Sequence, residues 1–274
     1  MKTVDGSMDF LQKIVEKKRE QVRGSAAGYP LPALRAAAEA RRDFRGFGAS
    51  LAAPVKAGRA HIIAEIKRAS PSKGVIRADV DAAETAGCYA RGGATAISVL
   101  TETEWFRGSV DDLITTRDNC LLPVLRKDFT IDEYQIVESA AIGADAILLI
   151  VRILDEGMLA GFMDTAHALG LDCLVEVHTP EELEIAQKAG ALLIGINNRN
   201  LNSFETDISI AAGMAAMLTR DQVAVAASGI GSRADVEAGL AAGIRGFLVG
   251  ESIMRSQNPE AFLRGLAGLD SPEK

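Results

Sequence analysis

Short apolar runs alternate with amphipathic segments along most of the chain. In five places small residues and a glycine precede an apolar run, at Gly93, Gly143, Gly170, Gly190 and Gly243. Glycine suits the position just past a helix end, where φ is positive. Short runs rich in Ile, Val and Leu are typical of strands buried on both faces. The repeated unit is therefore a helix, a glycine stop and a buried strand.

Eight strands are predicted on this basis, with room for one crossover helix between consecutive strands. They cover His61–Lys67, Ala94–Leu100, Leu121–Lys127, Ala144–Val151, Leu171–Val177, Leu192–Asn197, Val223–Ala227 and Gly246–Val249. Thr179, followed by Pro180, and Ser232 are predicted to cap two of the helices. Strict alternation predicts a parallel sheet with helices outside it. Eight units favour a closed (β/α)8 TIM barrel over an open doubly wound sheet.

The segment before the first strand predicts further helices. Apolar residues at helical spacing follow Phe10, and Leu31 to Ala38 also suits a helix, with Pro32 in its first turn. We expect a single domain over residues 1–274. Residues 8–56 would form an N-terminal helical extension packed on the barrel, and residues 57–268 the barrel itself.

The composition is that of a globular chain, since 48% of the 274 residues are hydrophobic and 24% are charged. A formal net charge of −7 gives no basic footprint for nucleic acid. The basic residues of the first helix, Lys18 among them, alternate with acids and indicate a solvated face. We see no signal peptide and no membrane span. We expect a monomer or weak homodimer that binds neither nucleic acid nor membrane.

Three cysteines lie far apart, at Cys88, Cys120 and Cys173. Their odd number and wide spacing favour neither a disulfide framework nor a thiolate zinc site. Each has apolar neighbours, as buried cysteines do. Chains with this cysteine usage are typical of a reducing compartment, so we expect a cytoplasmic protein.

Charged and polar residues interrupt the apolar strands near their carboxyl ends. Because side chains on a strand alternate between faces, residues two apart share a face. The same-face pairs are Glu65 with Lys67, Lys127 with Phe129, Glu176 with His178, and Asn197 with Arg199. Active sites of barrels form at this end of the strands. The pairs are therefore expected to meet in the barrel mouth, although a mutually satisfied ion network would give the same pattern.

The predicted mouth is positive although the whole chain is negative. Two acids oppose three bases there, namely Glu65 and Glu176 against Lys67, Lys127 and Arg199. A buried charge is costly unless it pairs or binds something, so an anionic small molecule is expected. His178 lies at the same end, but a packed loop residue is an equal interpretation. No two histidines have metal-ligand spacing, and no metal site is predicted.

Glycine-containing turns follow the last two strands. Ser228-Gly229 comes after the seventh strand and Gly250-Glu251 after the eighth. In barrels these loops commonly bind phosphate through backbone N–H groups and a helix N-terminus. A rival interpretation is the dinucleotide fingerprint, because a G-x-G-x-x-A pattern begins at Gly229 and Glu251 lies about 20 residues further on. That fingerprint, however, normally occupies the first βα unit of a domain.

These residues resemble a known family. The segment Ala64-Glu-Ile-Lys-Arg-Ala-Ser-Pro-Ser-Lys-Gly74 is similar to the first-strand signature of the indole-3-glycerol-phosphate synthases of tryptophan biosynthesis. The resemblance covers roughly residues 10–268 and continues in Val124–Phe129, Glu176–His178, Gly195–Leu201, Ser228–Gly229 and Val249–Met254. It implies a (β/α)8 lyase without metal or organic cofactor. The implied reaction converts 1-(2-carboxyphenylamino)-1-deoxyribulose 5-phosphate to indole-3-glycerol phosphate, CO2 and water.

The resemblance also implies roles for the mouth residues. Lys127 would be the general acid of ring closure, and Glu176 would steady the developing charge or the departing hydroxyl. Glu65 would be the base of late proton removal and Lys67 an acid in dehydration, though these two roles could be exchanged. Asn197 would position the substrate. The implied substrate-binding residues are Ser70, Phe129, Arg199, Ser228, Gly229, Gly250 and Glu251, the last through its backbone N–H.

One position departs from the family pattern. The family usually has a glutamate directly before the Ser-Gly of the seventh strand, and Ala227 stands here. The mouth therefore holds one acid fewer. Two alternatives stay open. One is another phosphate-binding barrel enzyme, such as phosphoribosylanthranilate isomerase. The other is a non-catalytic phosphometabolite-binding barrel, which this alanine favours.

Overall fold

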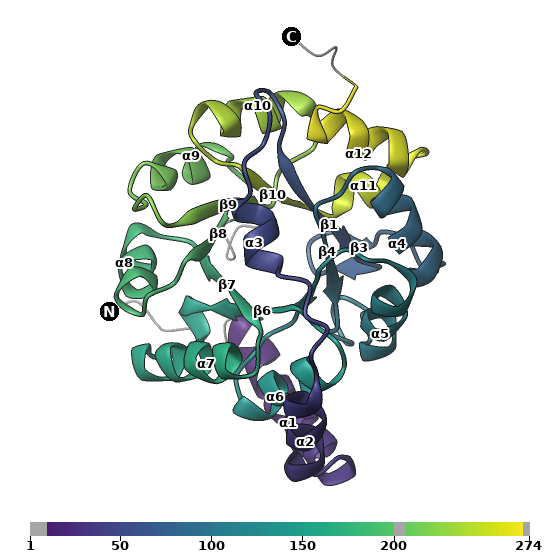
Figure 1. Cartoon of the computed structure of the whole chain (residues 1–274), viewed down its shortest axis with the longest axis vertical. Coiled ribbons are helices and arrows are strands. Elements are labelled where there is room, and N and C mark those ends of the chain that lie inside the picture. Colours follow the sequence, from purple (N-terminus) through teal and green to yellow (C-terminus); the bar gives the residue numbers. More distant parts are fainter. Residues whose placement is uncertain (1–9, 200–205, 271–274) are drawn as a thin grey trace, which may run out of the picture.

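The computed structural model describes residues 10–199 and 206–270. Within these residues, parallel strands close into a barrel in the order β1-β10-β9-β8-β7-β6-β5-β4, with helices around it (Figure 1). The strands are β1 (His61–Ile66), β4 (Ala96–Leu100), β5 (Val124–Lys127), β6 (Ala146–Ile150), β7 (Asp172–Val177), β8 (Leu193–Asn197), β9 (Val223–Ala227) and β10 (Gly246–Val249). The closed order confirms the (β/α)8 barrel and excludes the open doubly wound sheet.

Two of the helices around the barrel begin at the predicted caps. Thr179 accepts a hydrogen bond from the backbone of Glu182, and Ser232 forms a capping box with Asp235. The helices are α4 (Ala82–Arg91), α5 (Val110–Asn119), α6 (Glu133–Ala141), α7 (Glu156–Ala168), α8 (Pro180–Lys188), α9 (Ser209–Ala215), α10 (Arg233–Ala241), α11 (Glu251–Arg255) and α12 (Pro259–Ala267), with the 3-10 turn η1 (Val151–Ile153) after β6. None of the described helices is long and apolar enough to cross a membrane.

Some predicted strand boundaries were wrong at the amino end. Strand β5 begins at Val124 rather than at Leu121, because Pro123 has no N–H to give to the ladder and Leu121 lies 89% exposed. Strand β4 begins at Ala96 rather than at Ala94, whose N–H closes the end of α4 on the Tyr89 carbonyl. The sequence reading also missed a small antiparallel pair after β1, formed by β2 (Ala69–Ser70) and β3 (Gly74–Val75).

Apolar side chains fill the barrel from its amino end. Helix α3 (Phe47–Ala52) places Phe47 and Leu51, both fully buried, against inward-facing residues such as Leu125 and Leu174. The backbone N–H of Gly48 donates to the carboxylate of Asp172, the first residue of β7 (2.8 Å). Figure 1 shows α3 in the centre of the strand ring. Among the described residues α3 thus closes the amino end of the barrel, whereas the carboxyl end is open to a ligand.

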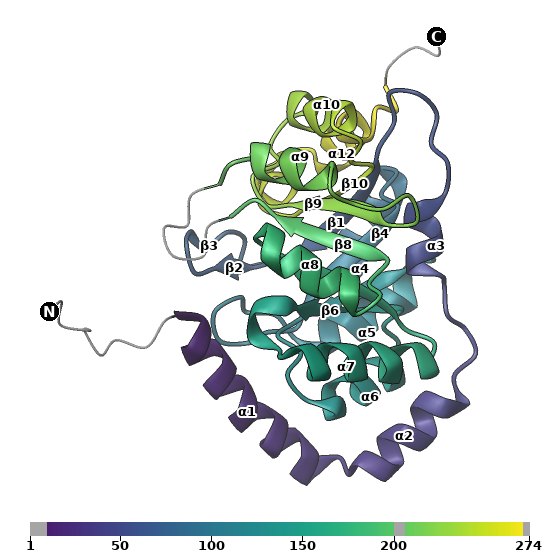
Figure 2. The ribbon, with the colours of Figure 1, turned by 90° about the vertical axis from the view of Figure 1, so that its left-hand side faces the viewer.

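Two further helices precede α3. Helix α2 (Leu31–Ala40) packs on α6, and α1 (Phe10–Gly28) reaches toward the side of the barrel that carries β2 and β3 (Figure 2). Residues 8 and 9 of the predicted extension lie outside the described residues. That residues 8–56 and 57–268 are two parts of one domain stays our proposal.

A buried ion pair fastens α1 to the barrel. The Lys18 ammonium lies 2.7 Å from a carboxylate oxygen of Asp128, and both side chains are buried. Thr101 donates to the other carboxylate oxygen (2.6 Å). The interpretation of Lys18 as part of a solvated face was wrong. Lys18 instead contacts Asp128, the residue that directly follows Lys127 in the sequence.

Replacing Lys18 with methionine should destabilise the fold by about 3 kcal/mol at neutral pH, because it leaves the Asp128 carboxylate buried with weaker partners. Burial alone would raise the pKa of Asp128, but the attraction of Lys18 and Arg126 outweighs it and lowers that pKa. The pair therefore stabilises the fold above the ordinary carboxyl pKa of about 4, and the difference should vanish as the pH falls further.

Denaturant unfolding of the wild type and of Lys18→Met between pH 3 and pH 7 measures this difference. Lys17→Met is the matched control, since Lys17 pairs with the exposed Glu20 and its replacement should leave the unfolding free energy close to that of the wild type. Equal unfolding free energies for the two variants at pH 7 would contradict the anchoring role of Lys18.

Candidate active site

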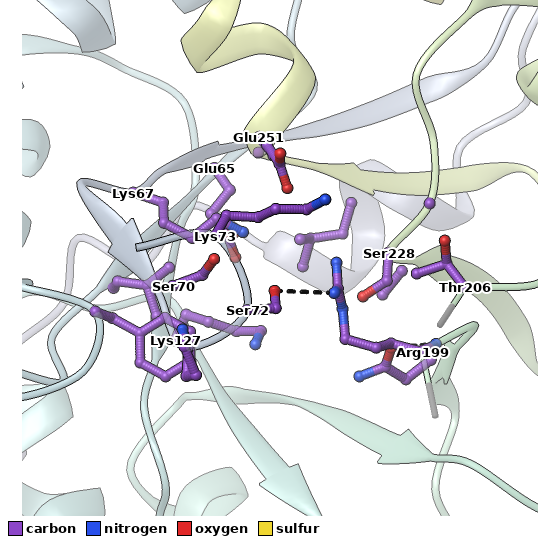
Figure 3. A pocket seen from close by; sticks show the side chains of 18 of the residues that line it. Glu65, Lys67, Ser70, Ser72, Lys73, Lys127, Arg199, Thr206, Ser228 and Glu251 are labelled. Carbon is purple, nitrogen blue, oxygen red and sulfur yellow. Dashed lines mark hydrogen bonds and ion pairs between the residues drawn. The ribbon is translucent and has the colours of Figure 1, made fainter. Parts of the chain in front are cut away.

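A cavity of about 490 Å³ opens at the carboxyl ends of the strands. All twelve side chains and glycines that the sequence assigned to catalysis or binding line it: Glu65, Lys67, Ser70, Lys127, Phe129, Glu176, Asn197, Arg199, Ser228, Gly229, Gly250 and Glu251. Figure 3 shows several of them around one space. The convergence of residues from separate strands is thus observed, and their chemical roles remain proposals.

The first ion pair comes from β1 and the residue after it. The Lys67 ammonium lies 2.7 Å from Oε1 of Glu65, as expected for residues that share a strand face. Ser98, on the neighbouring strand β4, donates to Oε2 of Glu65 (3.5 Å). Burial opposes ionisation of Glu65, but attraction by Lys67 and by Lys127 outweighs it and lowers the pKa of this carboxyl. Glu65 is therefore a buried carboxylate, ionised at neutral pH.

The second ion pair joins β5 to β7 across the mouth. Nζ of Lys127 lies 4.0 Å from Oε2 of Glu176. Asn197, from β8, donates through Nδ2 to Oε1 of the same carboxylate (3.1 Å). Lys127 also acts electrostatically on Glu65. One ammonium therefore lies within the field of two carboxylates.

The segment that includes β2 and β3 covers part of the mouth. Arg199 donates through Nη1 to the hydroxyl of Ser72 (3.1 Å), drawn as the dashed line in Figure 3. Ser72 and Lys73 line the cavity, and sequence reasoning assigned neither of them. Both lie inside the segment that carried the family resemblance, so the signal was present. Asn200 and Leu201 of the same resemblance lie outside the described residues.

One wall of the cavity is apolar. Phe129 and Phe106 lie with ring centroids 6.1 Å apart. Helix α1 adds Phe10, Leu11 and Ile14 to the lining. The sequence reading recognised the helical spacing of these α1 residues but took it for packing on the barrel only. The wall offers an apolar surface that includes aromatic rings, against which an aryl group could pack.

Backbone turns after β9 and β10 form the opposite side. Ser228 has φ 68° and Gly229 φ 79°, so two consecutive residues are left-handed. The Ser228 carbonyl is held by the side-chain amide of Asn198 (3.0 Å). Ser252 donates to the Ile230 carbonyl (2.9 Å), which ties the two turns together. Such turns present backbone N–H groups to an anion.

The dinucleotide interpretation of this region fits the structure poorly. The N–H groups of Gly231 and Ser232 both donate to the Asp235 carboxylate, at 2.9 and 2.8 Å, and so belong to the start of α10. Glu251, the supposed ribose ligand, accepts from Nε of Arg255 (3.1 Å). The segment around Gly229 therefore lines a barrel mouth rather than a nucleotide crevice.

The lining is net positive, as the sequence predicted. Five cations (Lys67, Lys73, Lys127, Arg199 and Arg255) face three carboxylates (Glu65, Glu176 and Glu251). Ala227 also lines the cavity, opposite Asn197 in the β8–β9 register. The described residues contain no group of three or more His, Cys, Asp or Glu side chains placed to hold a metal ion.

Gly250 permits the close approach of α11 to Glu65. A Cβ at this position would lie 2.6 Å from Oε1 of Glu65. Gly250→Ala should therefore displace the Glu65 carboxylate or α11, at a cost of about 1–3 kcal/mol of stability. Gly265→Ala is the control, because a Cβ there meets nothing within 4 Å and alanine favours a helix. Denaturant unfolding compares them, and an unchanged midpoint for Gly250→Ala would contradict this packing.

Comparisons with known proteins agree with the geometry. Solved structures of low sequence identity share the fold. The 3-hexulose-6-phosphate synthase of Salmonella typhimurium has a TM-score of 0.62 at 15% identity, covering 76% of this chain and 97% of that one. The thiamine phosphate pyrophosphorylase of Pyrococcus furiosus has a TM-score of 0.57 at 17% identity, covering 77% and 95%. These likenesses support the barrel alone.

Sequence relatives are much closer. The indole-3-glycerol phosphate synthase of Desulfosudis oleivorans is 51% identical over 258 residues, covering 94% of this chain and 98% of that protein. The proteins of the same name from Leptothrix cholodnii and Laribacter hongkongensis are 47% and 46% identical, with the same coverage. The family model described as indole-3-glycerol phosphate synthase matches residues 11–266. The chain belongs to the indole-3-glycerol phosphate synthase family.

Proposed function

We propose that this protein converts 1-(2-carboxyphenylamino)-1-deoxyribulose 5-phosphate to indole-3-glycerol phosphate, CO2 and water in tryptophan biosynthesis. The observation that carries the proposal is the meeting of Glu65, Lys67, Lys127 and Glu176 in one cavity. An acid–base reaction needs such groups close together and partly shielded from water. Family membership supports the same conclusion.

The cavity offers a place for each part of this substrate. The turns that contain Ser228, Gly229 and Gly250 suit the phosphate, because their backbone N–H groups and the net positive lining favour an anion. The apolar wall around Phe129 suits the aryl ring. We place the ribulose ketone between these two ends, beside Lys127, which lines the same cavity. Ser70 and Arg199 line the space between.

Ring closure is assigned to Lys127. The aryl carbon that bears the carboxylate attacks the ketone carbon, and the ketone oxygen takes a proton from the Lys127 ammonium. The carboxylate then leaves as CO2, and the ring recovers its aromaticity. Glu176 supports this step, because its carboxylate, held by Asn197, stabilises positive charge on Lys127 and on the closing ring.

Dehydration is assigned to the other ion pair. The new hydroxyl leaves as water with a proton from an acid, and a base removes the proton that completes the indole. Lys67 and Glu65 lie 2.7 Å apart at the cavity floor, so both partners of such an exchange are present. The pair could also work with the two roles exchanged.

Two rival functions lose support here. An isomerase of phosphoribosylated anthranilate would belong to a different family from the one that matches. A non-catalytic binding barrel was favoured by Ala227, yet the acid–base set described above does not include this position. We further propose that the protein acts in the cytoplasm, as a monomer or weak homodimer, without a metal or organic cofactor. The free thiols of Cys88, Cys120 and Cys173 suit that compartment.

Lys127→Met should lower turnover by about 100-fold or more, because the general acid is lost while the side chain keeps its length. Substrate binding should be largely retained, since the phosphate turns and the apolar wall are untouched. Stopped assays of product and equilibrium titration of substrate separate the two effects. Lys17→Met, on the exposed face of α1, should behave as wild type. Normal turnover in Lys127→Met would refute the assignment.

Assays of the purified wild type on both candidate substrates distinguish the functions. Ultraviolet or fluorescence detection should record an indole product from the arylamino ribulose phosphate and no turnover of phosphoribosylated anthranilate. Turnover of the second substrate alone would establish the isomerase. Tight binding of the first substrate without product, in a folded preparation, would establish the binding barrel.

A further inference from the structure

His178 lies behind the cavity, directly after β7, and its side chain is only 4% exposed. Its imidazole stands between two carboxylates. Nδ1 lies 3.2 Å from Oε2 of Glu182, on α8, and Nε2 lies 3.5 Å from Oε1 of Glu176. The sequence left open whether His178 lies in the mouth or packs as a loop residue. The ring does not line the cavity, but it touches a residue that does.

The Glu182 side fixes one ring nitrogen. The same Glu182 oxygen also accepts the backbone N–H of His178 (2.7 Å), and Arg152 of η1 donates to the other oxygen (2.7 Å). Burial would raise the pKa of Glu182, but the hydrogen bonds from His178 and Arg152 outweigh it and lower that pKa. An ionised carboxylate only accepts hydrogen bonds, so Nδ1 carries a proton.

The contact with Glu176 indicates whether the other ring nitrogen, Nε2, carries a proton. Nε2 is a buried polar atom without a hydrogen-bond partner, and Oε1 of Glu176 lies 3.5 Å from it. A bare lone pair facing a carboxylate oxygen in a buried setting is repelled, whereas an N–H group is attracted.

We propose that His178 is a positioning residue for Glu176, held as an imidazolium whose Nε2–H donates to Oε1 of that carboxylate. Asn197 donates to the same oxygen (3.1 Å). Oε1 is then fixed by two donors from the scaffold, and Oε2 is left facing Lys127 at 4.0 Å. The proposal rests on the function proposed above, because it gives Glu176 the orientation that ring closure needs.

The groups around His178 form a row of alternating charge from the surface to the cavity. They are Arg152 from η1, Glu182 from α8, His178 itself, Glu176 from β7 and Lys127 from β5. A neutral imidazole would place two carboxylates next to each other in this row with no cation between them. The positive ring separates them, and this is the electrostatic reason for its charge.

A spectroscopic test does not depend on activity. The full chain has three histidines, at His61, His167 and His178, so imidazole nitrogen resonances of protein labelled with 15N-histidine are assigned by comparison with His178→Asn. We expect both His178 ring nitrogens to be protonated at pH 7, and the Nε2 resonance to change in Glu176→Gln because its acceptor is altered. A bare Nε2 in the wild type at pH 7 would overturn the proposal, whatever the substrate.

A matched pair of variants tests the positioning role in catalysis. In His178→Asn the amide takes the place of Nδ1 and keeps a donor toward Glu182. In His178→Gln the longer amide reaches the place of Nε2 and keeps a donor toward Glu176. We expect kcat to fall about tenfold in His178→Asn with KM near wild type, and to be mostly rescued in His178→Gln.

A merely structural role gives the opposite order, because only His178→Asn keeps the Glu182 contact that fastens the start of α8. A higher kcat in His178→Asn than in His178→Gln would therefore overturn the proposal. Thermal unfolding of both variants shows whether each is folded, and the wild-type spectrum decides the question if either is not. An inactive wild type with a doubly protonated His178 would refute the proposed function while leaving the charge row intact.

Discussion

Opposite charges buried side by side hold this site together. Neither Glu65 nor Lys67 could lie at the inner face of the barrel alone, since an isolated ion in such a place costs several kcal/mol or loses its charge. At 2.7 Å the Lys67 ammonium helps to lower the pKa of the buried Glu65 carboxyl. Lys127 and Glu176 repeat the arrangement more loosely, at 4.0 Å, which is longer than a hydrogen bond. Burying these charged groups costs folding free energy, and the same groups are the ones that an acid–base reaction needs.

The same principle extends the site beyond the barrel strands. Asp128 directly follows Lys127, and its carboxylate is neutralised by Lys18 from α1 (2.7 Å). The helix held by that pair carries Phe10, Leu11 and Ile14 into the cavity wall. An electrostatic contact thus places an apolar surface, and the segment before the barrel becomes part of the site.

Much of the site could be predicted from the sequence, because in a (β/α)8 barrel the position of a residue along its strand determines where its side chain lies. Period-2 alternation in β1 put Glu65 and Lys67 on one face, and the carboxyl end of each strand placed Lys127, Glu176 and Asn197 at one rim. The segments that carried the family resemblance then supplied roles for the same residues. Even the glycine turns at Gly229 and Gly250 lie where that reasoning put them.

The remainder depended on contacts between distant segments, which no local pattern encodes. Lys18 has the same helical context as its exposed neighbours, and only its meeting with Asp128 makes it buried. The orientation of His178 depends on Glu182, one helical turn later, and on Arg152. Pro123 was visible in the sequence and could have corrected the start of β5.

Helix α3, which closes the amino end of the barrel, also determines the path by which the small products leave. With Phe47 and Leu51 fully buried inside the strand ring, the barrel encloses a pocket that is closed at the amino end and opens at the carboxyl end. The carbon dioxide and the water released during turnover must leave past the same rim through which the sugar phosphate came in.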